Sequence, residues 1–472
     1  MNLSLRLRCN DHLTSPPVDL LLVFWCLLAF AATPLLMLRI SPYAGPLPQW
    51  GASLAGLVVG VVLLQVSRPM IAKLRTRIQA LPTPLIALLV GAALRLAWVL
   101  VFPSTPQSDG RTYLQLARAL ADGAPYQTAG TFAYWPVGYP LWLAGWLQFV
   151  DVPGAVLLSQ LVAYIVGFMG IYRLARRLRG EGAARIAAWS FALWPNLLAQ
   201  LATPEKESVV IALLPWVMLA VLDAAPKWSA FVAGLALGFA ILVQPSLQFL
   251  LPLVLVMYWL RLRGNSAFLP ALLITLGTAM VVLPWTLRNI AVLGAPVLVS
   301  TNGGENLYRA NNPLANGGYT DVGEKDLSGL SELERDRQGR QLAVQWIRAN
   351  PFDFLALGLE KQLRFMGDDS PSIYASLKRG GGTQDMRIYA LIKALGNLWW
   401  LIFWLILAMT VIANRDDGPR DERWLIWGWF YLFALHSIFE SSSKYHLPMI
   451  WVLCVLLGCL VVRPAAVNTK WI

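Results

Sequence analysis

The sequence predicts an all-α integral membrane protein, a polytopic bundle of about twelve transmembrane helices with interfacial helices and a small periplasmic segment outside. Three observations predict it: composition, apolar segment length and charge distribution. Of the 472 residues, 57% are hydrophobic and 14% charged, and the mean hydropathy is +0.56. Soluble domains carry roughly 25% charged residues. A span needs about 20 apolar residues, so a dozen spans leave about half of the chain outside the membrane.

Apolar runs bounded by charged or turn residues give the expected spans. They are Val18–Leu38, Trp50–Val66, Pro84–Phe102, Ala155–Ala175, Ile186–Ala202, Val209–Leu222, Phe231–Val243, Leu247–Leu260, Ala267–Leu287, Ile388–Ala413, Trp424–Phe439 and Leu447–Val462.

Lysine and arginine gather in alternate connections between these runs. If the basic N-terminus is cytoplasmic, the clusters at 68–77, 173–185 and 415–423 all lie on the cytoplasmic side. Short loops of the other parity are poor in both residues, as the positive-inside rule requires. Topology therefore explains the formal net charge of +12, and no nucleic acid partner is expected.

The N-terminal run and the cysteines have plain structural interpretations. Ala29-Phe30-Ala31 resembles a signal-peptide cleavage site, but the apolar run before it is long, which favours a retained anchor. The four cysteines (Cys9, Cys26, Cys454 and Cys459) are too scattered for a disulfide framework, and we expect them to be packing residues.

Two outer segments are too long to be simple connections. Residues 103–154 contain two weakly amphipathic stretches, Ser108–Asp122 and Val137–Phe149, which could lie along the interface. Residues 288–387 combine Asn/Gly-rich turns at 300–319 with helical patterns at Ser331–Ala349 and Pro351–Phe365. Asn350-Pro351 separates these two patterns, because proline favours the first turn of a helix. Residues 379–383 are expected to form a loop.

Two outer acidic segments are candidates for chemistry. Asp109 and Tyr113, four residues apart, share a helix face, so a carboxylate and a phenol point the same way. Glu205, Lys206 and Glu207 place three charges at a membrane edge, where charges often mark a functional cavity. Both segments also suit an ordinary helix start, with Ser or Thr as the cap and acids in the first turn.

Basic residues follow at two later membrane edges. Arg288, after Trp285, either extends to the interface or binds a phosphate, for which guanidinium geometry is suited. The turn at 441–446 places Lys444, Tyr445 and His446 outside the membrane. Three histidines in the whole chain do not suggest a structural zinc site. A divalent cation held by outer carboxylates remains open, and no cofactor is predicted with certainty.

The order of these motifs resembles the GT-C superfamily of membrane glycosyltransferases, in the branch of protein O-mannosyltransferases and lipid-A aminoarabinose transferases. The motifs are Ser108-Asp109-x-x-x-Tyr113, Gly123-x-x-Tyr126, Trp135–Pro140, Glu205–Glu207, Pro284–Asn289, Ser300–Leu307, Asn311–Pro313, Gly317–Tyr319 and Lys444–Pro448. They extend over most of the chain.

The resemblance implies transfer of a sugar from a polyprenyl-phosphate donor, with inversion, to a glycan, lipid or protein acceptor on the periplasmic side. Asp109 then matches the general base, and Glu205 or Glu207 the second acid. Arg288, Lys444, Lys206 and Arg111 are expected near the donor phosphate. Expected substrate-binding residues are Tyr113, Tyr139, Asn302, Glu305, Asn306, Asn311, Tyr445 and His446.

The sequence departs from the family pattern at two places, and two other functions are possible for it. Relatives often carry a lysine before the paired prolines, where this chain has Tyr134-Trp135-Pro136, and an Arg-Tyr where it has Lys444-Tyr445. An O-antigen ligase- or polymerase-like transferase would also have many spans, but residues 288–387 contain no histidine. A transporter would need ionisable residues at mid-membrane, where Arg95 is the main example.

The expected organisation has four parts. They are an N-terminal helix pair (1–83), a transmembrane core (84–287) that includes the first outer loop (103–154), a second outer segment (288–387) and C-terminal helices (388–472). A bacterial inner membrane, with the active site facing the periplasm, is the expected location.

Overall fold

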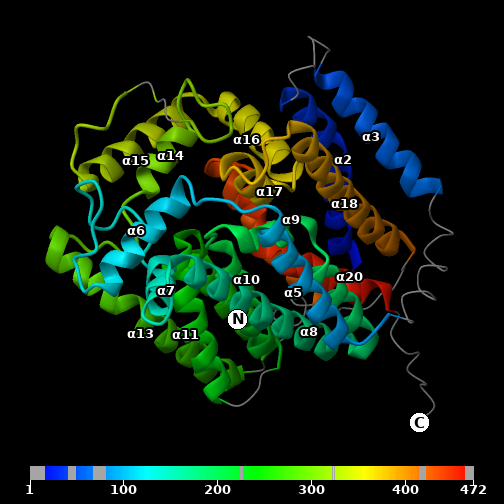
Figure 1. The fold of residues 1–472 in the computed structure, drawn as a ribbon, viewed down its shortest axis with the longest axis horizontal. Coiled ribbons are helices and arrows are strands. Elements are labelled where there is room, and N and C mark those ends of the chain that lie inside the picture. Colours follow the sequence, from blue (N-terminus) through cyan, green and yellow to red (C-terminus); the bar gives the residue numbers. More distant parts are fainter. Residues whose placement is uncertain are drawn as a thin grey trace.

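The computed structural model describes residues 16–40, 49–66, 81–223, 227–262, 264–320, 323, 325–413 and 421–462. In this part of the chain the regular structure is helical, and the only extended pairing is an isolated bridge between Thr128 and Thr131. The prediction of an all-α fold is confirmed. Helices from distant parts of the sequence pack side by side in one bundle (Figure 1).

Every apolar run predicted as a span forms helix. The helices are α2 (Leu20–Ile40), α3 (Gln49–Val66), α5 (Pro84–Val101), α8 (Val152–Ala192), α10 (Glu207–Asp223), α11 (Lys227–Val243), α12 (Leu250–Arg261), α13 (Phe268–Leu293), α18 (Met386–Ala413), α19 (Trp424–Ile438) and α20 (Ile450–Val461).

Among the described residues, six helical segments are long and apolar enough to cross a membrane. They are Pro17–Met37, Pro84–Val101, Val152–Ala192, Phe268–Leu293, Met386–Ala413 and Ser443–Val461. The multi-pass membrane character is therefore confirmed. The other apolar helices are shorter, so the number of twelve spans stays a prediction.

Two predicted spans meet in α8. The backbone leaves helical geometry at Arg179 and at Gly180, whose φ of 78° is in the left-handed region that favours glycine. The chain therefore bends there, and α8 consists of two helical arms. The second arm ends at Ala192, before the short helix α9 (Pro195–Ala199), so the predicted span Ile186–Ala202 is interrupted. Proline is favoured at the first helical position and disfavours helix in the residue before it.

Exposed apolar side chains follow one face of α13. Leu272, Leu276, Met280, Leu283 and Leu287 are each at least 40% exposed and recur at three- or four-residue spacing. Such a stripe is out of place in water but suits a helix whose outer face contacts lipid.

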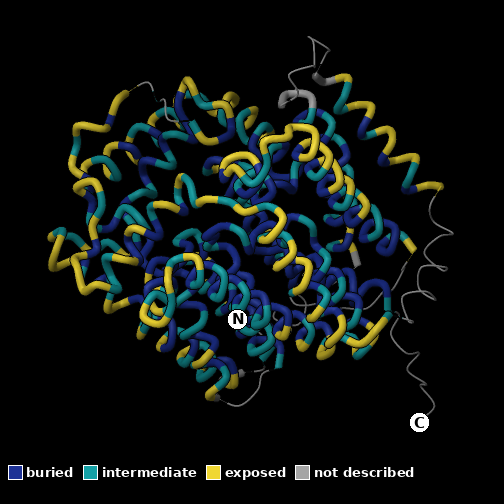
Figure 2. The backbone as a smooth tube through the Cα atoms, in the orientation of Figure 1, coloured by how far each residue is buried: buried dark blue, intermediate teal, exposed yellow. Residues whose placement is uncertain are grey.

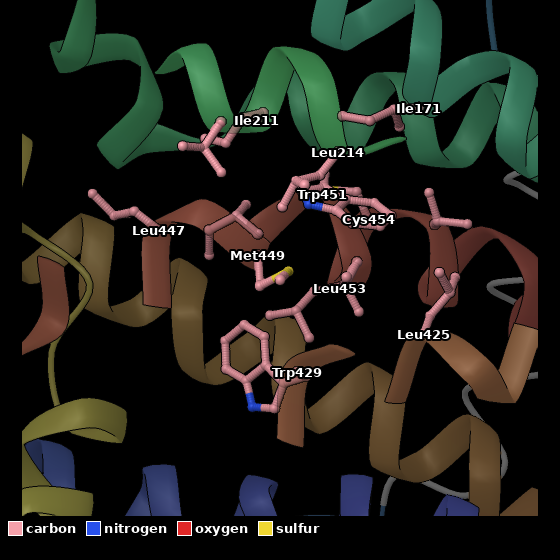
Figure 3. Close-up of a cluster of buried hydrophobic side chains, with 14 of the residues drawn as sticks. Ile171, Ile211, Leu214, Leu425, Trp429, Leu447, Met449, Trp451, Leu453 and Cys454 are labelled. Atoms are coloured by element: carbon pink, nitrogen blue, oxygen red, sulfur yellow. The ribbon is translucent and has the colours of Figure 1, made fainter. Parts of the chain in front are cut away.

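Helix α20 lies at the centre of the apolar core. All of its residues are buried, and Figure 2 shows buried residues concentrated in the interior of the bundle. Figure 3 shows Leu214 of α10 on one side of this helix and Trp429 of α19 on the other. A Cβ at Gly458 would lie 2.3 Å from the carbonyl oxygen of Ala183, so glycine permits the close approach of α20 and α8.

The cysteines within the described residues are buried and form no disulfide. They are Cys26, Cys454 and Cys459, and they pack in the core as expected. Cys9 lies outside the described residues.

One end of the bundle is closed by four arginine–carboxylate pairs. Arg423 donates two hydrogen bonds of 2.8 Å to Asp19, and Nη2 of Arg179 lies 2.6 Å from Oε1 of Glu422. The other two pairs are Arg177–Asp223 and Arg261–Asp421. All four pairs join segments that the charge pattern assigns to the same side of the membrane.

The predicted outer helices are present within a few residues of their expected bounds. They are α6 (Asp109–Ala121), α7 (Gly138–Leu147), α15 (Glu332–Ala349) and α16 (Pro351–Met366). Ser331 and Glu334 form a capping box at the start of α15, and Pro351 starts α16.

A further helix, α14 (Gly303–Ala310), lies within the stretch that we predicted as turns. Its Tyr308 packs in a small apolar cluster with Leu327 and Ala343 of the outer segment. Tertiary packing therefore stabilises a helix that its Asn/Gly-rich sequence does not suggest. Figure 1 shows α14, α15 and α16 next to one another and near α6.

Candidate active site

Charged side chains from three distant segments meet at the end of the bundle opposite the arginine pairs. Nζ of Lys444 lies 3.3 Å from Oδ2 of Asp109 and 3.9 Å from Oε1 of Glu207. Asp109 begins α6, Glu207 begins α10, and Lys444 lies in the 3₁₀ segment η7 (Ser443–Met449). Because α10 ends at Asp223, which pairs with Arg177, the two charged regions lie at opposite ends of this helix.

The three side chains differ in their access to water. The side chain of Asp109 is 44% exposed and that of Lys444 is 32% exposed, but that of Glu207 is only 4% exposed. Oε2 of Glu207 has no hydrogen-bond partner among the described residues. A buried carboxylate oxygen without a partner is rare and unfavourable in an ordinary interior, so the pairing of this cluster is incomplete.

The lysines set the charge state of Asp109. The charge of Lys444 lowers the pKa of Asp109, although burial acts in the opposite direction, and Lys206 contributes further lowering. Asp109 is therefore ionised well below neutral pH. Burial in turn lowers the pKa of Lys206, with Glu207 and Asp109 opposing it. Lys206 thus belongs to the same cluster.

The helix-start interpretation of the two acidic segments holds in part, because Ser108 occupies the N-cap position of α6, and Asp109 and Glu207 lie in the first turns of α6 and α10. Ser108 makes no capping hydrogen bond, and its hydroxyl lies 3.3 Å from Oδ1 of Asp109, to which it donates. Its φ of 51° is uncommon for a residue other than glycine. Likewise, Thr203 donates to Oε1 of Glu205 at 3.1 Å. Both hydroxyl groups thus donate hydrogen bonds to carboxylates instead of capping a helix.

Glu205 lies apart from Asp109 and faces the packed interior. Its Oε2 accepts a hydrogen bond of 2.6 Å from Ser372, and its backbone carbonyl accepts one from Gln160. Burial, followed by the charge of Glu207, raises the pKa of Glu205 to about 7. The sequence left open which glutamate joins Asp109, and the structure brings Glu207 there.

Aromatic side chains pack beside Asp109. The ring of Tyr113 makes edge contacts with Trp135 at 5.6 Å and with Tyr139 at 5.3 Å. Burial, and then the charges of Asp109 and Glu207, raise the pKa of Tyr113 well above its ordinary value. Tyr113 is thus next to both acids, and Tyr139 lies behind it.

Two of the four predicted phosphate-binding residues lie elsewhere. Arg288 donates to the carbonyl oxygens of Phe132 at 2.7 Å and Tyr126 at 2.9 Å, and its guanidinium lies over the ring of Trp285. It therefore holds the first outer loop on α13. Arg111 is exposed and donates to Gln107.

Within the last outer turn, Lys444 contacts Asp109 and Glu207 directly. Tyr445 donates to Glu440 through its hydroxyl. His446 is buried, stacks on Trp400 at 4.7 Å and lies within hydrogen-bond distance (3.1 Å) of Asp369. His446 thus fixes the turn to the core.

The predicted residues of the Asn/Gly-rich stretch lie on and around α14. Asn302 precedes this helix and Asn306 lies within it. Glu305 accepts a hydrogen bond from Arg309. Asn311 donates to the carbonyl of Ile438 at 2.8 Å and accepts from Lys361 at 2.9 Å. Asn311 thus joins α14 to the end of α19, just before the turn that carries Lys444.

Sequence reasoning missed Glu440, Arg309 and Lys361. Burial is the main cause that raises the pKa of Glu440, and the charges of Arg309, Asp109 and Lys444 all act on it, which places it between α14 and the lysine. An acid directly after an apolar run was a usable signal for Glu440. Lys361 carried no such signal, because it resembles any lysine of an amphipathic helix.

An apolar cavity lies inside the bundle, between α10, α12, α19 and α20. Its lining includes Leu214 and Val217 of α10, Trp424 of α19, and Met449 and Trp451 beyond Lys444. Leu214 is one and a half to two turns from Glu207, about 10 Å along the helix. The two segments that carry Glu207 and Lys444 therefore also line this cavity, and Figure 3 shows Leu214, Met449 and Trp451 of its lining.

The described residues contain no group of three or more His, Cys, Asp or Glu side chains placed to hold a metal ion. The ammonium group of Lys444 lies between Asp109 and Glu207. The structure thus places the ammonium group of Lys444 next to two of the outer carboxylates that the sequence suggested as possible metal ligands.

A known protein family matches part of this chain. Residues 139–285, from α7 to α13, match the family model of dolichyl-phosphate-mannose-protein mannosyltransferases. A search of curated proteins finds no match.

The similar solved structures include the oligosaccharyltransferase of Archaeoglobus fulgidus in complex with zinc and sulfate, at 12% identity and a TM-score of 0.44, over 79% of this chain and 48% of that one. A second is the archaeal oligosaccharyltransferase AglB from Archaeoglobus fulgidus in complex with an inhibitory peptide and a dolichol phosphate, at 10% identity and a TM-score of 0.41, over 80% of this chain and 50% of that one. The chain spans about half the length of these proteins. The predicted resemblance to GT-C membrane glycosyltransferases is thus confirmed by the family match over residues 139–285.

Proposed function

We propose that this chain is a membrane glycosyltransferase that moves a sugar from a polyprenyl-phosphate donor to an acceptor, with inversion, using Asp109 as the general base. The match to dolichyl-phosphate-mannose-protein mannosyltransferases supports the donor class. The sugar is a hexose or a pentose, and the acceptor is a glycan, a lipid or a protein. We place the site on the periplasmic face of a bacterial inner membrane.

One observation carries the proposal: a charged cluster and an apolar cavity share the same two segments. A polyprenyl-phosphate sugar has an apolar tail, an anionic phosphate and a reactive anomeric carbon at their boundary. The Glu207 end of α10 and the Lys444 turn supply charge, and the continuation of both segments supplies apolar lining. In this proposal the tail lies along the apolar continuation of these two segments, and the sugar lies at their charged end.

Asp109 suits the role of base because it is ionised and accessible. The charge of Lys444 keeps its pKa below the usual value, and its side chain is half exposed. The acceptor hydroxyl oxygen attacks the anomeric carbon and gives its proton to Asp109. The bond from that carbon to the phosphate oxygen breaks, and the electron pair leaves with the phosphate. A positioned base typically contributes about 100- to 10,000-fold.

The other charged residues have supporting roles in this proposal. Glu207 holds the ammonium of Lys444 from the buried side, so that Lys444 stays next to Asp109. Lys444 and Lys206 stabilise the charge that grows on the leaving phosphate, since fixed cations act most strongly where charge develops. Arg288 positions the first outer loop, given its bonds to Phe132 and Tyr126.

The test uses the purified full-length protein in nanodiscs. Lipids that co-purify with it are identified by mass spectrometry, and polyprenyl-phosphate sugars of that class are then supplied with candidate acceptors. We expect polyprenyl phosphate to be bound and to be released during sugar transfer. Asp109→Asn should slow this transfer by about 100- to 10,000-fold. Asp122→Asn, at the exposed other end of α6, is the matched control. No polyprenyl lipid and no release with any donor would contradict the proposal.

A further inference from the structure

Two arginines outside the catalytic cluster lie on helices that approach unusually closely. A Cβ at Gly304 of α14 would lie 1.8 Å from the carbonyl oxygen of Asp336 in α15. A Cβ at Gly339 would lie 2.7 Å from the carbonyl oxygen of Gly304. Only glycine fits such contacts, so these residues allow the two helices to touch. As a result, Arg309 of α14 and Arg335 of α15 lie around the same carboxylate.

That carboxylate is Glu305, which both arginines share. Arg309 donates to Oε1 of Glu305, and Arg335 lies 3.9 Å from Oε2. Nε of Arg335 and Oε2 of Glu305 have no hydrogen-bond partner among the described residues. Tyr134 completes the group, since its hydroxyl accepts a hydrogen bond of 3.5 Å from Arg309 and its ring lies 5.7 Å from Arg335. Much of the donor capacity of the two guanidinium groups is unused.

Two chains of contacts connect this group to the catalytic cluster. The charge of Arg309 acts on Glu440, on which Asp109 and Lys444 also act. On the other side, the ring of Tyr134 lies 5.7 Å from that of Trp135, which contacts Tyr113. The rings of Tyr134, Trp135 and Tyr113 therefore connect Arg335 to the helix that carries Asp109.

The balance of charge differs between the two groups. The catalytic cluster has the ammonium groups of Lys206 and Lys444, but its acids are Asp109, Glu207 and Glu440. These cations are therefore already matched by carboxylates. The neighbouring group has two guanidinium groups for one carboxylate, since Asp336 pairs with Arg340 at 3.0 Å. Within this neighbouring group, the positive charges of Arg309 and Arg335 thus exceed the negative charge of Glu305 by one.

We propose that Arg309, Arg335 and Tyr134 form a phosphate-binding subsite next to the catalytic cluster, which engages a phosphate group of a substrate. The proposal builds on the proposed function and adds residues to it. Guanidinium groups match phosphate oxygens through paired donors, and the side chains of Arg309 and Arg335 are 19% and 21% exposed. Glu305 holds them in place and competes with the phosphate for their donors.

The test measures binding and needs no turnover. Full-length protein in nanodiscs is titrated with a polyprenyl phosphate and with the corresponding polyprenol, and the ratio of the two affinities reports recognition of the phosphate. We expect a clear preference for the phosphate, about tenfold weaker in Arg309→Gln and in Arg335→Gln. Arg340→Gln, on the same helix but 63% exposed, is the control and should keep the preference.

A further variant, at Glu305, should change the preference for the phosphate in the opposite direction. Glu305→Gln removes the competing carboxylate and should strengthen the preference severalfold, which also guards against misfolding of the arginine variants. A preference for the lipid phosphate that is unchanged in all three variants, together with glycerol 3-phosphate binding that none of them changes, would overturn the proposal.

Titration with glycerol 3-phosphate distinguishes the source of the phosphate. If this monoester binds through the arginines and the lipid does not, the subsite serves the acceptor. A wild type that binds phosphate through the pair but transfers no sugar would refute the proposed function and leave this inference standing.

Discussion

The two charged ends of the bundle pair their side chains in different ways. At one end, four carboxylates each face a guanidinium group, as in the two 2.8 Å bonds from Arg423 to Asp19. At the other end, Lys444 lies 3.3 Å from Asp109 and 3.9 Å from Glu207, and one oxygen of Glu207 has no partner among the described residues. At the arginine end each carboxylate has a guanidinium partner, whereas at the lysine end one carboxylate oxygen remains available to bind another group.

This difference separates the charged residues that stabilise the fold from those that take part in the proposed reaction. Guanidinium groups bind carboxylates in a fixed fork, whereas an ammonium group is a compact charge on a flexible stem. A network in which each group is satisfied rigidifies the structure, while incomplete pairing is typical of functional sites. We therefore expect substitutions at the arginine end to change stability, and substitutions at the lysine end to change activity.

The largest expected effect on stability is at the buried pair of Asp19 and Arg423. Asp19→Asn removes the charge of the carboxylate that accepts two hydrogen bonds from Arg423, and both residues are buried, at 5% and 1% exposed. Breaking such a pair destabilises by about 3–5 kcal/mol. Thermal unfolding in detergent should show a much lower Tm, with unchanged activity per folded molecule.

The matched control lies at the same end. Arg177 and Asp223 have side chains that are 50% and 30% exposed, and such pairs contribute about 0–1 kcal/mol. Asp223→Asn should therefore leave the Tm nearly unchanged. Equal losses in the two variants would remove the distinction between buried and exposed pairs.

Next is the pH dependence that Glu205 gives to stability. Burial raises the pKa of this acid from 4.5 to about 7, so the folded protein binds an extra proton in that range. The contribution of Glu205 to the free energy of unfolding is therefore greatest at low pH, and it decreases as the pH rises from about 4.5 to 7. Since one pKa unit equals about 1.4 kcal/mol, the change is on the order of 3 kcal/mol. Glu205→Gln should lack this change in pH-dependent unfolding, and parallel curves for the two proteins would contradict it.

A smaller effect with a different signature is expected at Glu207. Glu207→Gln removes a buried carboxylate with an unpartnered oxygen, so the Tm should stay the same or rise slightly. Lys444 loses the charge that holds it, and transfer should slow by about tenfold, or ~1.4 kcal/mol. A large fall in Tm without loss of transfer would assign Glu207 to structure.

Most of the helical framework could be predicted from the sequence because apolar length and proline positions act locally. The capping box at Ser331 and the helix start at Pro351 are examples. Helix α14 could not, since it depends on contacts between Gly304 and Gly339, which are distant in sequence.

The site was predictable as residue types on one side of the membrane, but not as contacts. Asp109, Glu207 and Lys444 come together, whereas Arg288 bonds to backbone carbonyls and His446 is buried against Trp400. The pattern of charges at the membrane edges predicts which residues lie on the same surface. Rotation of each helix, set by packing, decides which of them face one another.

A double-mutant cycle on sugar transfer tests the central claim most directly, namely that Asp109 and Lys444 act as one unit. Asp109→Asn, Lys444→Met and the double variant are compared with the wild type at one pH. Groups in contact show non-additive effects, so we predict that the double variant loses at least tenfold less activity than the product of the single losses. Losses that multiply would show that the two side chains act independently and would contradict the account.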